Sequence, residues 1–128
     1  MLFRKAPKSK RELPQSEREA IVDLLHLCLY ADSAISLKEG EFLNDVVDII
    51  GWEAKSSFSS YEARSVSSAR AAKESSVAKT EFLEFAAQRL KSDESKALAV
   101  DLCRQLFAVD GTDEREADLL REIRLALR

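Results

Sequence analysis

Two stretches of the chain repeat one pattern of apolar and polar positions. Each runs through an apolar segment, an aspartate, a short polar turn and a second apolar segment, over residues 21–50 and 99–127. The apolar residues recur at i, i+3, i+4 and i+7, the spacing of one face of an α-helix. The matched positions are Leu24, Leu25, Cys28 and Leu29 with Leu102, Cys103, Leu106 and Phe107, and Phe42, Leu43, Val46, Ile49 and Ile50 with Leu119, Leu120, Ile123, Ala126 and Leu127. The pattern therefore predicts two similar helical hairpins that bury their apolar faces against each other.

Capping boxes predict where the helices begin. In such a box a Ser or Asp side chain, and a Glu three residues later, satisfy free N–H groups of the first helical turn. The boxes or related caps are Ser16–Glu19, Ser36–Glu39, Ser59–Glu62, Ser92 with Ser95 in the Glu position, and Asp113 with Glu116. With Gly51 as a C-terminal stop, the expected helices cover about 16–31, 36–50, 60–73, 77–91, 92–108 and 113–128.

The middle of the chain has the weakest apolar pattern. Residues 53–76 contain nine serines, and the apolar stripe of the expected third helix is thin: Phe58, Ala63, Val66 and Ala69. We expect this segment to be the most mobile part of the fold, or to expose apolar surface that a second copy of the chain covers.

Composition agrees with an all-helical domain. The chain has 128 residues, ordinarily one domain, and 45% of them are hydrophobic. Helix-favouring Ala, Leu, Glu, Lys and Arg are abundant, and no six-residue segment alternates apolar and polar positions. We predict an all-α fold, a compact bundle of about six to seven helices built from two similar helical hairpins. This single domain covers residues 15–128 and follows a basic, flexible arm at residues 1–14.

Charge is distributed unevenly. The first eleven residues carry five basic groups and no acid, whereas the net charge of the whole chain is −3. The acidic body argues against nucleic acid as a partner, because phosphates require a basic surface. The arm could instead make a weak contact with a membrane surface or an acidic partner, or remain a solvated tail. No run is long enough for a signal peptide or a membrane span, so we expect a cytoplasmic protein.

The two cysteines, Cys28 and Cys103, occupy apolar helix positions far apart in sequence. Buried, reduced thiols are the expected state. With one histidine at these spacings they match no structural zinc site.

Four carboxylates occupy equivalent places in the two hairpins: Asp32, Glu39, Asp110 and Glu116. If the hairpins pack about a pseudo-twofold axis, these groups could converge and bind Ca²⁺ or Mg²⁺ through oxygen ligands. The alternative is that Glu39 and Glu116 only cap helices, where carboxylates also gain from the helix dipole. The loops are not EF-hands, because the twelfth position counted from each aspartate lacks the glutamate that those loops require.

His26 is the only histidine, and Asp23 and Tyr30 are spaced to share its helix face. Such a trio could poise a general base. The alternative is a histidine at the edge of the core or in a groove, without a catalytic role.

The pairing of LCLYADSAISLKEGEFL, residues 27–43, with LFAVDGTDEREADLL, residues 106–120, resembles the TerB-like family, named for tellurite-resistance proteins. The residues that carry the resemblance run from Ala31-Asp32 to Glu39 and from Val109-Asp110-Gly111 to Glu116. It covers about residues 15–128. The chain departs from the family pattern at Ser33, where glycine is usual, and in a second loop one residue shorter than the first.

The resemblance implies an all-helical domain of two packed halves and a role in bacterial stress systems. It also implies a divalent metal site at Asp32, Glu39, Asp110 and Glu116, and it implies no enzymatic activity. The expectation is a non-catalytic TerB-like binding or scaffold module of the tellurite-resistance type, with a protein partner and a calcium or magnesium ion as the candidate cofactor.

Two alternatives remain open. The same carboxylates with His26 could form a metal-dependent hydrolase, provided that His26 lies within reach of them. The chain could instead be a structural homo-oligomer, so that both a monomer and a homodimer are compatible with the sequence.

Overall fold

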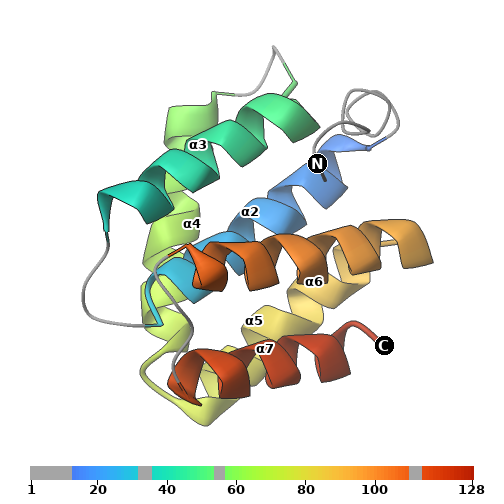
Figure 1. Ribbon diagram of the computed structural model, residues 1–128. Helices are drawn as coiled ribbons and strands as arrows, with labels where there is room; N and C mark the ends of the chain where they lie inside the picture. The colour runs from blue at the N-terminus through green and yellow to red at the C-terminus, as the bar shows by residue number, and fades with distance from the viewer. Residues whose placement is uncertain (1–12, 32–35, 54–56, 110–113) are drawn as a thin grey trace.

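Six α-helices, and no strands, make up the regular structure of the residues described by the computed structural model, which are 13–31, 36–53, 57–109 and 114–128 (Figure 1). The helices are α2 (Gln15–Leu29), α3 (Leu37–Ile50), α4 (Phe58–Ala72), α5 (Ser76–Arg89), α6 (Asp93–Ala108) and α7 (Glu114–Ala126). The predicted all-α bundle is confirmed.

Helix α2 is the centre of the bundle. It contacts α3, α4, α5 and α6, and Figure 1 shows it running between them. Residues 21–29 are buried without interruption. A helix enclosed in this way is normally apolar all round, and α2 departs from that rule at Asp23 and His26.

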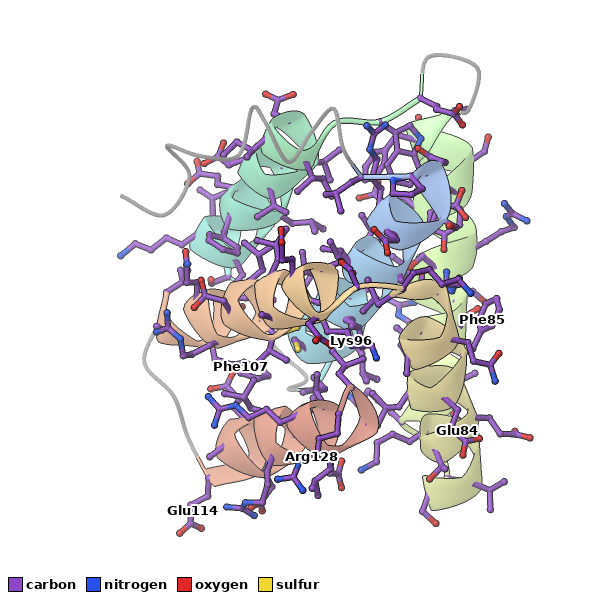
Figure 2. The ribbon with its side chains drawn as sticks, turned by 90° about the vertical axis from the view of Figure 1, so that its right-hand side faces the viewer. Glu84, Phe85, Lys96, Phe107, Glu114 and Arg128 are labelled. Atoms are coloured by element: carbon purple, nitrogen blue, oxygen red, sulfur yellow. The ribbon has the colours of Figure 1, made fainter. Side chains whose placement is uncertain are left out.

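The two predicted hairpins are α2–α3 and α6–α7, and they pack together mainly through their first helices. Helix α2 contacts α6 over much of its length, and α3 also touches α6. Helix α7 packs on α6 and α5. In Figure 2, Phe107 lies on the side of α6 that faces α7, and it is fully buried. The apolar faces read from the sequence therefore form one common core.

Two of the expected capping boxes are present. The amide of Glu39 donates to Ser36 Oγ over 3.1 Å, and the amide of Ser36 donates to Glu39 Oε1 over 3.0 Å. Ser92 and Ser95 form the same reciprocal pair at the start of α6. Both helix starts were predictable because the groups that satisfy each box lie within four residues.

The expected box at Ser16 is wrong. Helix α2 begins at Gln15, and its N-cap is Pro14, whose carbonyl accepts the amides of Glu17 and Arg18 at 3.0 and 3.2 Å. Glu19 accepts a hydrogen bond from the Gln15 side chain instead. The fixed φ of proline suits the entry to a helix, so the proline sets the boundary.

The expected box at Ser59 is also wrong. Helix α4 begins at Phe58, and Ser57 caps it by accepting the Ser60 amide over 3.3 Å. The face of α4 that packs on the bundle shares the buried Ala69 with the apolar stripe expected there and is otherwise rotated from it. Its residues are Tyr61, Ser65, Ala69 and Ala72. The rotation follows from the polar side chains of α2, which require polar partners.

Glu17 joins the start of α2 to the start of α6. Its carboxylate is buried and accepts the amide of Lys91 over 2.7 Å and the hydroxyl of Ser95 over 3.2 Å. An acid at a helix N-terminus also interacts favourably with the helix dipole. The basic arm before residue 13 and the expected cap Asp113 lie outside the described residues. In the part of the chain that is described, every helix is too short or too polar to traverse a bilayer.

Candidate functional site

A polar cluster lies inside the bundle, where α2 meets α4 and α5. Its centre is formed by Asp23 and His26, which are 6% and 1% exposed. Buried polar and charged groups are costly unless they are hydrogen-bonded or paired. The neighbouring helices should therefore supply partners for both residues.

Asp23 is fully partnered. The Tyr61 hydroxyl lies 2.8 and 2.9 Å from its two carboxylate oxygens, and Ser65 donates to Oδ1 over 2.6 Å. Arg89 Nη2 pairs with Oδ2 at 2.6 Å, and Nη1 of the same guanidinium donates to the Tyr61 hydroxyl. Burial, and then the nearby Asp23 carboxylate, raise the pKa of Tyr61. One carboxylate thus holds α2, α4 and α5 together.

His26 is linked to Asp23 through Ser65. Its Nδ1 lies 2.7 Å from Ser65 Oγ. A serine hydroxyl has one proton, and that of Ser65 points to the Asp23 carboxylate 2.6 Å away. Nδ1 of His26 must therefore carry the ring proton and donate to Ser65. It follows that Nε2 carries a lone pair.

That lone pair has no partner among the described residues. Nε2 of His26 is buried without a hydrogen bond, and the closest charged atom is Oε2 of Glu62, 3.9 Å away. Burial lowers the pKa of His26 to about 4, although the charge of Asp23 acts in the opposite direction. The imidazole is therefore neutral near pH 7, and it is a hydrogen-bond acceptor at Nε2.

His26 lines a cavity of about 540 Å³ between α2, α3 and α4. The lining combines apolar side chains with a few polar ones. The residues are His26, Leu29, Tyr30, Gly40, Leu43, Asn44, Ser59, Glu62, Ala63 and Val66. A small cavity with apolar walls and few polar groups is the usual form of a ligand site.

Gly40 keeps one wall of this cavity open. It lies inside α3, where glycine costs about 0.5–1 kcal/mol relative to alanine. A Cβ built on Gly40 would meet no atom within 4 Å. Packing therefore does not require a glycine at this position, and any larger side chain would project into open space.

The electrostatics of the cavity favour a cation. Among the described residues that line the cavity, Glu62 is the one acid and there is no lysine or arginine; the Glu62 side chain is 39% exposed. Arg70 lies beside the lining residue Tyr30, with its guanidinium 4.9 Å from the centre of the Tyr30 ring. A neutral imidazole and a carboxylate thus belong to residues that line the same space.

The order of the cluster differs from that of a nucleophilic triad. In a Ser-His-Asp triad the histidine lies between the other two and removes the serine proton. Here the serine lies between Asp23 and His26, and it accepts a hydrogen bond from the imidazole. The buried Ser65 hydroxyl is therefore not activated for attack, and the cluster positions groups without supplying a nucleophile.

The four predicted metal ligands are placed only in part. Asp32 and Asp110 lie outside the described residues. Glu39 is buried and engaged in its capping box. Glu116 is also buried, and its charge acts on the Cys28 thiol at the end of α2. The described ranges contain no group of three or more His, Cys, Asp or Glu side chains that could hold a metal ion.

The two cysteines meet in the core between α2 and α6. Both are free and buried, which confirms the expected state. Burial, contact with the Cys103 thiol and the charge of Glu116 raise the pKa of Cys28. A protonated, enclosed thiol is a poor nucleophile and a poor metal ligand.

Comparisons of the chain with protein-family models, with curated proteins and with solved structures gave no match. The architecture defines an all-helical bundle, and the polar cluster and its cavity are the features on which a functional argument depends.

Several residues of this site were not predicted from the sequence: Ser65, Tyr61, Glu62, Arg89 and Gly40. The sequence does contain one signal for them. Asp23 and His26 interrupt an otherwise apolar run over residues 20–29, so each requires a buried partner from another element. The i, i+4 spacing of Tyr61 and Ser65 in a serine-rich helix identifies a face that could provide those partners.

Proposed function

We propose that the chain is a non-catalytic binding module of the TerB-like type, and that it binds a partner protein at the cavity between α2, α3 and α4. The observation that carries this proposal is the buried Nε2 of His26, a residue that lines the cavity, because this atom has no hydrogen-bond partner among the described residues. A buried acceptor without a donor is costly. A partner that supplies the donor recovers this cost when it binds.

The hydrogen bonds of Ser65 argue against a hydrolase that uses this serine as its nucleophile. The Ser65 hydroxyl donates a hydrogen bond to Asp23 and accepts one from His26. Among the described residues, the charged groups near His26 are Asp23 and Glu62, and neither belongs to the four predicted metal ligands. The link that the hydrolase alternative requires between His26 and those ligands has no support in this part of the chain.

The proposal includes a second, metal-dependent element at Asp32, Glu39, Asp110 and Glu116, which would bind Ca²⁺ or Mg²⁺. Two observations support it. Helices α2 and α6 pack together, and Glu116 acts on Cys28, four residues before Asp32 in the sequence. The role of such an ion would be to hold the ends of the two hairpins in one arrangement.

Affinity capture with a matched variant tests the proposal. The full chain and its Gly40→Leu variant are immobilised side by side, and a protein retained only by the first is identified, purified and titrated by calorimetry. The variant places a larger side chain at a lining position where a Cβ would meet no atom within 4 Å, so we expect the fold to be retained. We expect the purified partner to bind the wild-type chain and to lose at least tenfold in affinity for the variant. Equal affinity would refute the cavity as the binding site, and turnover of the partner by substoichiometric amounts of the chain would refute a non-catalytic role.

A further inference from the structure

The chemistry of the cavity restricts what can bind in it. Two residues with acceptor atoms line the cavity, the neutral His26 and Glu62, and Nε2 of the first lies 3.9 Å from Oε2 of the second. A single donor nitrogen can lie about 2.8 Å from both atoms, the normal length of a charge-assisted hydrogen bond. The ligand should therefore contribute one nitrogen with at least two hydrogens.

The charges around His26 restrict the chemistry of the ligand further. Among the described residues, the charged groups near His26 are Asp23 from its own helix and Glu62 from α4, while α3 contributes Gly40, Leu43 and Asn44, none of which is charged. Asp23 is paired with Arg89, so Glu62 is the remaining charged group among the described residues that line the cavity. A cationic donor is favoured over a neutral one.

The remaining walls suit a short alkyl chain. Leu29, Leu43, Ala63 and Val66 provide apolar surface beside the two acceptors. An ammonium group has three donors on one nitrogen, and its methylene stem can lie along apolar surface.

We propose that this cavity binds a primary alkylammonium group, with His26 Nε2 and the Glu62 carboxylate as its two hydrogen-bond acceptors. The inference rests on the proposed function, in which the group is the side chain of a lysine on the partner protein. A free alkylamine has the same chemistry and is the other source that the experiment must distinguish.

Titration of the ¹⁵N-labelled full chain with n-butylammonium tests the inference directly. The readouts are the ¹⁵N shift of His26 Nε2 and the backbone amide shifts around the cavity. We expect saturable shifts at both places, and none with n-butanol, which has the same stem and no charge. Shifts of equal size with n-butanol, or amide shifts without a response at Nε2, would overturn the inference.

Three variants test whether n-butylammonium binds in this cavity. Glu62→Gln should raise the Kd of n-butylammonium about tenfold, the value of one charge-assisted hydrogen bond. Gly40→Leu should abolish the shifts. Glu84→Gln is the matched control, because Glu84 is an exposed acid on α5, away from α3 and the cavity (Figure 2). An unchanged Kd in Glu62→Gln, or an equal loss in Glu84→Gln, would contradict the proposal.

A second titration identifies the source of the amine. A blocked lysine, Nα-acetyl-lysine N-methylamide, should bind more tightly than n-butylammonium if a protein side chain is the natural ligand, and more weakly if a free amine is. Either order supports an ammonium site, whereas binding of the side-chain-acetylated lysine with equal affinity would refute it.

Failure of this inference can be told apart from failure of the proposed function. A partner whose binding is lost in Gly40→Leu, but persists in Glu62→Gln and after acetylation of its lysines, would retain the cavity as a docking site and eliminate the ammonium ligand. A partner that binds Gly40→Leu normally would eliminate the docking site itself.

Discussion

Ser65 Oγ lies 2.7 Å from Nδ1 of His26, so a serine of α4 fixes the tautomer of the one histidine in the chain. The same hydroxyl donates to Asp23 over 2.6 Å. Helix α4 therefore packs on the central helix through a polar contact, and the geometry of the cavity beside it depends on that contact.

Replacing Ser65 by alanine should destabilise the fold by about 1–3 kcal/mol. The change leaves the buried Nδ1–H of His26 without an acceptor and removes one donor from Asp23, and each unsatisfied group has a cost of that order. Urea unfolding measures the difference. Ser67→Ala is the control, since Ser67 is exposed on the same helix and its loss should change the free energy of unfolding by less than about 0.5 kcal/mol. Equal effects of the two changes would show that Ser65 is not a partner of the α2 cluster.

Arg89 should contribute more to the free energy of unfolding than an arginine on the surface does. Arg89→Met leaves the buried Asp23 carboxylate without its cationic partner, and we expect a loss of about 3 kcal/mol in the free energy of unfolding. Adding Asp23→Asn to that variant should restore part of the loss, because the unpaired charge is then gone. The control is Arg104→Met, whose partner Asp101 lies on the surface. That change should cost no more than about 1 kcal/mol. A strictly additive double variant would contradict the assigned pairing.

The helix starts were the part of the fold most open to prediction from sequence. The boxes at Ser36 and Ser92 involve groups within four residues, so local sequence determines them. The boxes expected at Ser16 and Ser59 match the same pattern and are absent, because Pro14 and Ser57 satisfy the helix ends earlier in the chain. A pattern identifies possible caps, and competition between neighbouring caps decides which one is used.

The candidate site was less predictable, because it depends on how α4 rotates against α2. The apolar stripe predicted that Ala63 and Val66 face the core, whereas Tyr61 and Ser65 do. Two buried polar residues on α2 outweigh a few small apolar side chains, since an unpaired buried charge costs several kcal/mol. Asp23 and His26 indicate in the sequence that α2 needs polar partners in the core. Which residues of α4 and α5 provide them is known only from the three-dimensional structure.

Lowering the pH should weaken the fold through His26. Its pKa is lowered to about 4 in the folded protein, against an ordinary value of 6.5. Between these values the unfolded chain binds the extra proton and the folded chain does not, so the free energy of unfolding falls as the pH drops. The contribution reaches about 3 kcal/mol near pH 4 and disappears above about pH 7.

A comparison of His26→Gln with the wild-type chain isolates that contribution. The variant lacks the titrating ring, so its stability should fall less steeply between pH 6.5 and 4.5 than that of the wild type. The measurement is urea unfolding at several pH values, and the quantity to compare is the slope of stability against pH. Identical slopes would show that His26 titrates normally in the folded protein.

The two thiols should be unreactive in the native state. Cys28 and Cys103 are buried in contact, and burial raises the pKa of Cys28. A reagent that requires the thiolate must wait for an opening of the bundle, and an opening free energy of about 3 kcal/mol slows the reaction roughly a hundredfold. Ellman's reagent with and without urea measures the ratio. Rapid modification of either thiol in the folded chain would contradict its enclosed position.

A divalent ion bound by the paired loops should require both aspartates. Calorimetric titration with Ca²⁺, Mg²⁺ and Mn²⁺ should give heat with the wild-type chain and none with the Asp32→Ala/Asp110→Ala double variant. We expect binding of these ions because carboxylate oxygens are the ligands that such hard divalent cations prefer. No heat with the wild-type chain, or the same heat with the variant, would remove the metal from the proposal and leave Glu39 and Glu116 as capping residues.

Substitutions of Gly40 should affect the stability of the fold and the binding of the partner in opposite directions. Alanine at this helical position should raise the free energy of unfolding by about 0.5–1 kcal/mol, because it reduces the freedom of the unfolded chain and its Cβ meets no atom within 4 Å. Gly51→Ala is the opposite control, since φ of Gly51 is 86° and a side chain there is strained. Thermal and urea unfolding should therefore move in opposite directions for the two variants. If Gly40→Ala is stabilising while Gly40→Leu loses the partner, the glycine is retained for the open cavity wall at the expense of helix stability; a destabilised Gly40→Ala would show instead that packing at α3 requires it.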